Sequence, residues 1–189
     1  MRWMALLLCA APAAAQEPTL TPAQGLAAWD RVFAVTSHPR CTNCHVGAEG
    51  RPMWQALGFG QDRVHGMAID AGESRIGAET VPCRTCHVTS ARPNTVPHAP
   101  PHIPDAWRLP PVELAWLGKS SAEVCAQLRD PDRNDGRTIA ELVTHLQTSA
   151  FVAWSFDPGA GRSAPAGSPA TIAADVARWG AAGTPCVGD

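Results

Sequence analysis

The chain has 189 residues with 15 basic and 17 acidic side chains, so its formal net charge at pH 7 is −2. A balance so close to neutral argues against nucleic acid or an anionic surface as a partner. Proline occurs 18 times and glycine 16 times, which indicates many turns and extended segments. We therefore expect a mainly α fold of short helices and long loops with little or no strand.

Residues 1–15 have the features of an export signal, and residues 16–189 are expected to form one domain. Arg2 supplies positive charge, a short apolar run follows, and alanines at the end of the segment offer a cleavage site. Cys9 lies in the apolar run, but the bulky Leu8 precedes it where lipid-attachment sites have a small residue. No other stretch approaches the roughly 18 apolar residues of a membrane span. We expect a periplasmic chain without a lipid anchor or a membrane span.

The first helix is predicted over residues 21–36. Thr21 is a favoured N-cap residue, and Pro22 takes the first helical position, where its missing N–H removes no helical hydrogen bond. The apolar residues at helical spacing after it are Leu26, Trp29 and Phe33. The helix is expected to end just before the first cysteine motif.

Two copies of one cysteine pattern follow, Cys41-Thr-Asn-Cys44-His45 and Cys83-Arg-Thr-Cys86-His87. This pattern is typical of haem c attachment, because the two thiols can reach both vinyl groups while the adjacent histidine projects its imidazole at the iron. We expect two haem c groups as cofactors, bound by the cysteines and histidines of both motifs. His45 and His87 are the expected proximal iron ligands.

Two alternatives fit these cysteines less well. Two Cys-x-x-Cys pairs can bind one zinc ion, but zinc gives no reason for a histidine to follow each pair. A thioredoxin-like dithiol needs one pair within a βαβ pattern, which the sequence does not show.

The distal iron ligands are open to several candidates. They are His38, His65, His98, His102, His145, Met53 and Met67. His65 is favoured because it lies between the two motifs, and His145 because it borders the apolar stripe of a predicted helix. The sequence does not reveal which distal ligand serves which haem. We expect bis-histidine ligation and low potentials, with methionine or water at one iron as the alternative.

The second half of the chain carries clear helix signals. Capping boxes are formed by Ser120 with Glu123 and by Thr138 with Glu141. The segments expected are an extended proline-rich stretch at 92–111, helices at 121–129 and 139–149, a turn at 130–137, a loop at 157–167 and a last helix from Ser168-Pro169 to about Trp179.

Cys125 and Cys186 remain outside the leader and the motifs. In an oxidising compartment a disulfide between them is the simplest outcome. It would close a loop of about 60 residues and add about 4 kcal/mol of stability in the chain-entropy model. The alternative is a cysteine that binds or senses another group.

Further features accompany the motifs between residues 40 and 187. They are a histidine between the motifs, Leu109-Pro110-Pro111, Ala115-Trp116, Gly118-Lys119-Ser120, Asn134-Asp135-Gly136-Arg137, His145, Pro158-Gly159 and Gly161-Arg162. With these features the chain resembles a family of small bacterial di-haem cytochromes c labelled as associated with isoquinoline 1-oxidoreductase. The resemblance supports His65 and His145 as ligands and implies a periplasmic molybdenum hydroxylase as redox partner. Arg108 stands where the family pattern has histidine.

Electron transfer to or from a redox partner, such as a molybdenum hydroxylase or another cytochrome, is the expected function. A small di-haem oxidoreductase of the peroxidase kind is the alternative, and it requires an open iron position and a distal acid or base. A chain this short leaves little room for a substrate pocket, so we expect a carrier rather than an enzyme. A haem sensor or a subunit of a larger complex is the third alternative. Two lobes meeting near residue 108 are the alternative organisation.

Overall fold

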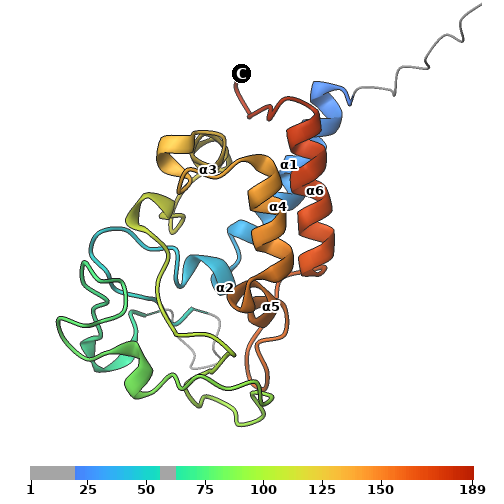
Figure 1. Ribbon diagram of the computed structural model, residues 1–189. Coiled ribbons are helices and arrows are strands. Elements are labelled where there is room, and N and C mark those ends of the chain that lie inside the picture. The colour runs from blue at the N-terminus through green and yellow to red at the C-terminus, as the bar shows by residue number, and fades with distance from the viewer. Residues whose placement is uncertain (1–19, 56–62) are drawn as a thin grey trace, which may run out of the picture.

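The computed structural model describes residues 20–55 and 63–189 (Figure 1). The α-helices are α1 (Pro22–Thr36), α2 (Pro39–Thr42), α3 (Ser121–Leu128), α4 (Ile139–Thr148), α5 (Ala150–Phe156) and α6 (Pro169–Ala181). Single 3-10 turns lie at Gly66–Ala68, Cys83–Thr85, Val112–Leu114 and Pro131–Arg133. In these residues β structure is limited to isolated bridges, Met53 with Val64 and Thr89 with Ile103. The prediction of a mainly α fold is confirmed.

Two other predictions concern the leader and the membrane. The expected export signal at 1–15, including Cys9, lies outside the described residues. Within the described part of the chain, no helix is long and apolar enough to cross a membrane.

The predicted helices begin at their capping signals. The N-cap residues Thr21, Ser120, Thr138 and Ser168 each accept a hydrogen bond from a backbone N–H three residues later, and each forms a capping box. The helix ends agree with the predicted ends within two residues. Local capping therefore determines where these helices start.

Helix α5 was not predicted. It starts after Ser149, whose extended backbone ends α4 and whose hydroxyl accepts from the Val152 N–H. The sequence of α5 is a short apolar run, and such a run carries no helical period that would distinguish it from a buried strand.

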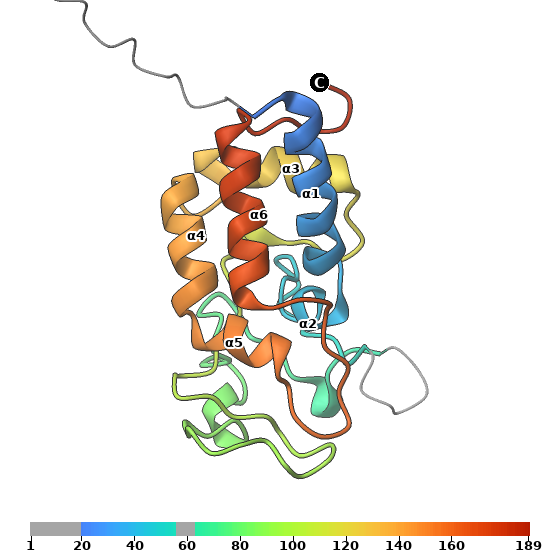
Figure 2. The same cartoon turned by 90° about the vertical axis from the view of Figure 1, so that its right-hand side faces the viewer.

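Helices α1, α4 and α6 lie side by side at one end of the molecule, and the loops of residues 45–55 and 63–110 lie toward the other end (Figure 2). The core between α1 and α6 centres on Trp29 and Trp179, which are both fully buried with ring centroids 5.0 Å apart. Gly180 permits close contact between α6 and α4, because a Cβ there would fall 2.5 Å from the Ile139 side chain. The two ends of the described chain thus form one helical frame.

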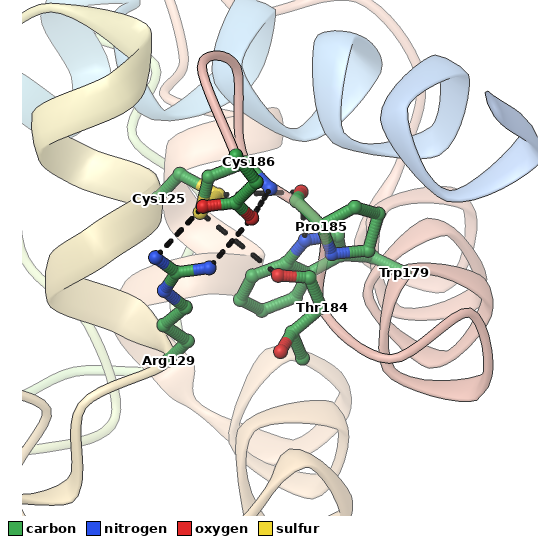
Figure 3. Close-up of polar contacts among 7 residues, drawn as sticks. Cys125, Arg129, Trp179, Thr184, Pro185 and Cys186 are labelled. Carbon is green, nitrogen blue, oxygen red and sulfur yellow. Dashed lines mark hydrogen bonds and ion pairs between the residues drawn. A yellow bond between two sulfur atoms is a disulfide. The ribbon is translucent and has the colours of Figure 1, made fainter. Parts of the chain in front are cut away.

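The predicted disulfide is confirmed. Cys125 of α3 and Cys186 are bonded, with their Cα atoms 5.7 Å apart (Figure 3). Beside the bond, the Trp179 indole donates to the Pro185 carbonyl at 3.0 Å, and Arg129 forms an ion pair with Asp189 at 2.7 Å. These contacts fasten the C-terminal tail to α3 and α6.

Replacing Cys125 and Cys186 together by serine should lower the free energy of unfolding by about 4 kcal/mol, because the loop that the bond closes regains its entropy in the unfolded chain. Urea unfolding followed by tryptophan fluorescence measures the change. Arg129→Gln is the matched control and should have a much smaller effect, because exposed ion pairs contribute little. Equal losses in the two variants would contradict this account of the tail.

Candidate functional site

Two cavities lie where the helical frame meets the loops, and each contains one cysteine motif. The first has a volume of about 1130 Å³ and is lined by Cys41, Cys44 and His45, together with residues of α1, α4 and α5. The second has a volume of about 250 Å³ and is lined by the cysteines and the histidine of the second motif. Residues common to both walls are Arg40, Cys44, Leu109 and Trp154. The two cavities therefore share a wall.

Each motif forms one tight helical turn. In the first motif, α2 begins after His38, whose Nδ1 accepts from the Arg40 N–H at 3.1 Å, and the His45 N–H donates to the Cys41 carbonyl at 3.0 Å. In the second motif, the His87 N–H donates to the Cys83 carbonyl at 2.9 Å. The four motif thiols are free. Each turn thus presents two thiols and an imidazole to its cavity.

Both motif histidines are fixed through Nδ1. The Nδ1 of His45 lies 2.8 Å from the Leu114 carbonyl oxygen, and the Nδ1 of His87 lies 2.8 Å from the Pro101 carbonyl oxygen. Because a carbonyl only accepts, Nδ1 must carry the proton, and this leaves the Nε2 lone pair to bind a metal. Burial lowers the pKa of His45 to about 3 and that of His87 to about 4. Both imidazoles are therefore neutral at pH 7.

Aromatic rings hold the same two imidazoles. His45 is stacked on Trp116 with ring centroids 3.4 Å apart, and the backbone N–H of Trp116 donates to the His45 carbonyl at 2.8 Å. His87 is stacked on Trp107 at 4.4 Å, and Trp107 contacts Trp154 at 5.2 Å. Each histidine therefore has a fixed ring plane as well as a fixed tautomer.

Arg75 joins the two segments that hold His45. Its guanidinium donates to the carbonyls of Val46, Gly47 and Pro110 at 2.9, 3.0 and 2.8 Å. The first two acceptors directly follow His45, and the third begins the segment that leads to Leu114. Arg75 thus keeps the histidine and its carbonyl acceptor in register.

A second histidine lies in each cavity wall. His65 and His87 both line the second cavity, with ring centroids 6.0 Å apart and ring planes inclined at 53°, and the His65 Nδ1 lies 2.9 Å from the Gly66 carbonyl oxygen. Two imidazoles that bind one metal from opposite sides at about 2.1 Å place their centroids about 6 Å apart. His145 of α4 and His45 both line the first cavity. The charge of His145 contributes to the lowered pKa of His45. The structure thus associates His65 with the second motif and His145 with the first.

The other distal candidates separate into two groups. His98, Met53 and Met67 line the second cavity. His38 and His102 are not among the residues that line either cavity, and His38 instead caps α2.

The prediction of two haem irons as cofactors needs a correction. Among residues 20–55 and 63–189, no group of three or more His, Cys, Asp and Glu side chains could hold a metal ion. This finding contradicts the prediction of two haem c groups with iron as cofactors. Each cavity wall contains the neutral imidazole of its motif histidine, His45 or His87, beside the free thiols of its motif.

Two unpaired indole groups add a further property of the cavity walls. The Nε1 atoms of Trp116 and Trp154 are buried and have no hydrogen-bond acceptor among the described residues. Trp116 lines the first cavity and Trp154 lines both. An unpaired buried N–H costs about 1–3 kcal/mol. A flat group with acceptor oxygens, tethered by the thiols, fits such walls.

Comparison with family models, with curated proteins and with solved structures finds no match to this chain. The resemblance to di-haem cytochromes c stays a prediction from the sequence.

Replacing Trp116 by alanine should lower the free energy of unfolding by about 3 kcal/mol, because the ring that supports His45 is lost. Trp116→Phe keeps an aromatic ring on the imidazole and removes the unpaired N–H, so it should cost less than about 1.5 kcal/mol. Urea unfolding of both variants measures the difference. A phenylalanine variant as unstable as the alanine variant would show that stacking is not what holds His45.

Proposed function

We propose that the chain is an exported electron-transfer protein whose two CxxCH segments are sites of covalent haem attachment. The observation that carries the proposal is the closeness of His65 and His87, whose ring centroids lie 6.0 Å apart in the cavity that the two thiols of the second motif also line. A haem between two such imidazoles would supply one-electron redox chemistry without an open coordination position. Its iron is ligated by the porphyrin nitrogens, so it needs one or two protein ligands rather than a cluster of three.

The tethering residues have distinct roles in this proposal. The thiols of each motif would hold one group covalently, and the Nε2 atoms of His45 and His87 would each supply one ligand to it. His145 in the first cavity and His65 in the second would supply the other ligand. The neutral state of these imidazoles at pH 7 supports this, since burial lowers the pKa of each.

The shared wall supports electron exchange between the two sites. Cys44 belongs to the first motif and also lines the second cavity, so groups held in the two cavities would lie close together. Trp154 lines both cavities and contacts Trp107, which is stacked on His87. An electron could therefore pass between the two sites without a large movement of the side chains in the shared wall.

The surface at the second motif supports an exchange with an external partner. Cys86 is exposed, and apolar side chains near it are exposed as well, with Val88 at 55% and Met67 at 81%. Exposed apolar side chains beside a redox group suit the core of a contact with another redox protein. By its resemblance, that partner is a periplasmic molybdenum hydroxylase or another cytochrome.

Carbon monoxide tests the proposed ligation. The reduced full chain, matured with its haems, should keep its visible spectrum when carbon monoxide is added, because both irons are saturated. His145→Ala and His65→Ala should each bind about one carbon monoxide per chain, since each opens one iron. His102→Ala is the matched control and should bind none.

Other outcomes would change the assignment. A spectral shift in the unaltered protein would show an open iron and favour the oxidoreductase alternative. A shift in His102→Ala, or none in His65→Ala, would contradict the pairing of histidines with cavities.

A further inference from the structure

The carbonyl that fixes His45 belongs to a short, exposed turn. Its residue, Leu114, ends the 3-10 turn that begins at Val112, and the Leu114 N–H donates to the Pro111 carbonyl at 3.0 Å. Val112 and Glu113 are exposed to solvent. A single turn of this kind has few hydrogen bonds of its own, so contacts from elsewhere must set the direction of the Leu114 carbonyl.

Gln127 of α3 makes such a contact. The Nε2 of its side chain donates to the Glu113 carbonyl, and the residue is only 3% exposed. The Glu113 carbonyl and the Leu114 N–H belong to one planar peptide unit, so this bond fixes the plane of that unit. Only the backbone dihedrals of Leu114 then lie between the fixed plane and the carbonyl oxygen that accepts from His45.

The other end of the Gln127 amide is unsatisfied. Its Oε1 atom is buried and has no hydrogen-bond partner among the described residues. A buried acceptor without a partner destabilises a protein, and an apolar side chain of the same length would avoid that cost. Val124 and Leu128 of the same helix are buried in the apolar core. Packing alone therefore does not account for a glutamine at this position, whereas the hydrogen bond to Glu113 does.

The segment that contains the turn is also held on both sides of it. Before the turn, Arg75 donates to the Pro110 carbonyl at 2.8 Å. After the turn, the backbone N–H groups of Trp116 and Leu117 donate to the carbonyl of His45 at 2.8 and 3.1 Å. The glutamine of α3 holds the turn between these two points, where the acceptor of the imidazole lies.

The second motif is held in a different way. Arg162 donates to the Ala99 carbonyl, and the side-chain amide of Asn94 pairs with the backbone N–H and carbonyl of His102, both at 2.9 Å. These contacts lie on either side of Pro101, whose carbonyl oxygen is the acceptor in the second motif. They come from residues outside α3, so a change in α3 should reach the first motif alone.

We propose that Gln127 is a positioning residue of the first cavity. By holding the Glu113 carbonyl it aims the Leu114 carbonyl at the Nδ1 of His45, and so it fixes the tautomer of the imidazole and the direction of its Nε2 lone pair. This chain of hydrogen bonds belongs to the protein alone. What it does for a bound group, namely to keep one ligand in one orientation, rests on the proposed function.

Hydrogen exchange at the ring N–H of His45 tests the inference. The exchange is followed by NMR in heavy water on the isotopically labelled full chain, kept reduced so that any low-spin iron is diamagnetic. Gln127→Met and Gln127→Leu remove the donor and the unpaired oxygen together and keep the site apolar. In both variants the His45 ring N–H should exchange about fivefold faster, because one hydrogen bond that holds its acceptor is lost. The ring N–H of His87 is the internal control and should keep its rate.

Ser121→Ala is the matched control in α3. It removes the hydrogen bond that the Trp29 indole donates to the Ser121 hydroxyl at 2.8 Å, which does not involve the turn, and it should leave the exchange at His45 unchanged. Urea unfolding separates positioning from packing. Gln127→Met should not lower the free energy of unfolding, because the buried unpaired oxygen is removed with the donor.

The contradicting results are distinct from a failure of the proposed function. Unchanged exchange at His45 in both Gln127 variants would overturn the inference, as would an equal rise at His87 or in Ser121→Ala, because the effect would then be a general loosening. A marked loss of stability in both variants would show that Gln127 serves packing instead. A chain that gains no covalent group overturns the proposed function, and the exchange rates still decide the role of Gln127.

Discussion

The hydrogen bond from the Nδ1 of each motif histidine to a backbone carbonyl is the constraint on which both cavities depend. At His45 the acceptor is Leu114, and at His87 it is Pro101. These bonds fix the tautomer, so that Nε2 keeps its lone pair, and they fix the direction in which that lone pair points. Burial then keeps both rings neutral. If either carbonyl moved, its imidazole could turn, and the thiols beside it would lose their defined relation to a ligand.

The rest of the fold keeps these carbonyls in place. Arg75 ties the segment that leads to Leu114 to the residues that follow His45, and the loop of Arg162 is latched to the segment that contains Pro101. These loops contain little regular secondary structure, so the side-chain hydrogen bonds of Arg75, which is buried, and Arg162, which is partly buried, connect them instead. The helical frame of α1, α4 and α6 supports the first cavity from the other side, and the disulfide fastens its C-terminal end. Because these hydrogen bonds and the helical frame hold the loops, the segment around the second motif needs neither a β-sheet nor a large hydrophobic core.

Sequence patterns predicted the parts of the structure that local chemistry determines. Capping residues such as Ser120 and Thr138 marked helix starts, and the only cysteines outside the leader and the motifs formed the disulfide. The carbonyl acceptors of the motif histidines could not be predicted, because every residue has a carbonyl and only the fold selects one. Likewise, the association of His65 with one cavity and of His145 with the other depends on how distant segments meet. The prediction of two haem c groups with iron was contradicted, because the described residues form no cluster of three or more metal-binding side chains.

Covalent attachment is the central claim, and the intact mass of the chain tests it most directly. After production with a haem c maturation system, the chain should gain the mass of two haems. Replacing Cys41 and Cys44 by serine should leave one haem, and replacing Cys83 and Cys86 should leave the other. A chain that keeps its four motif thiols free and gains no haem mass under these conditions would contradict the account.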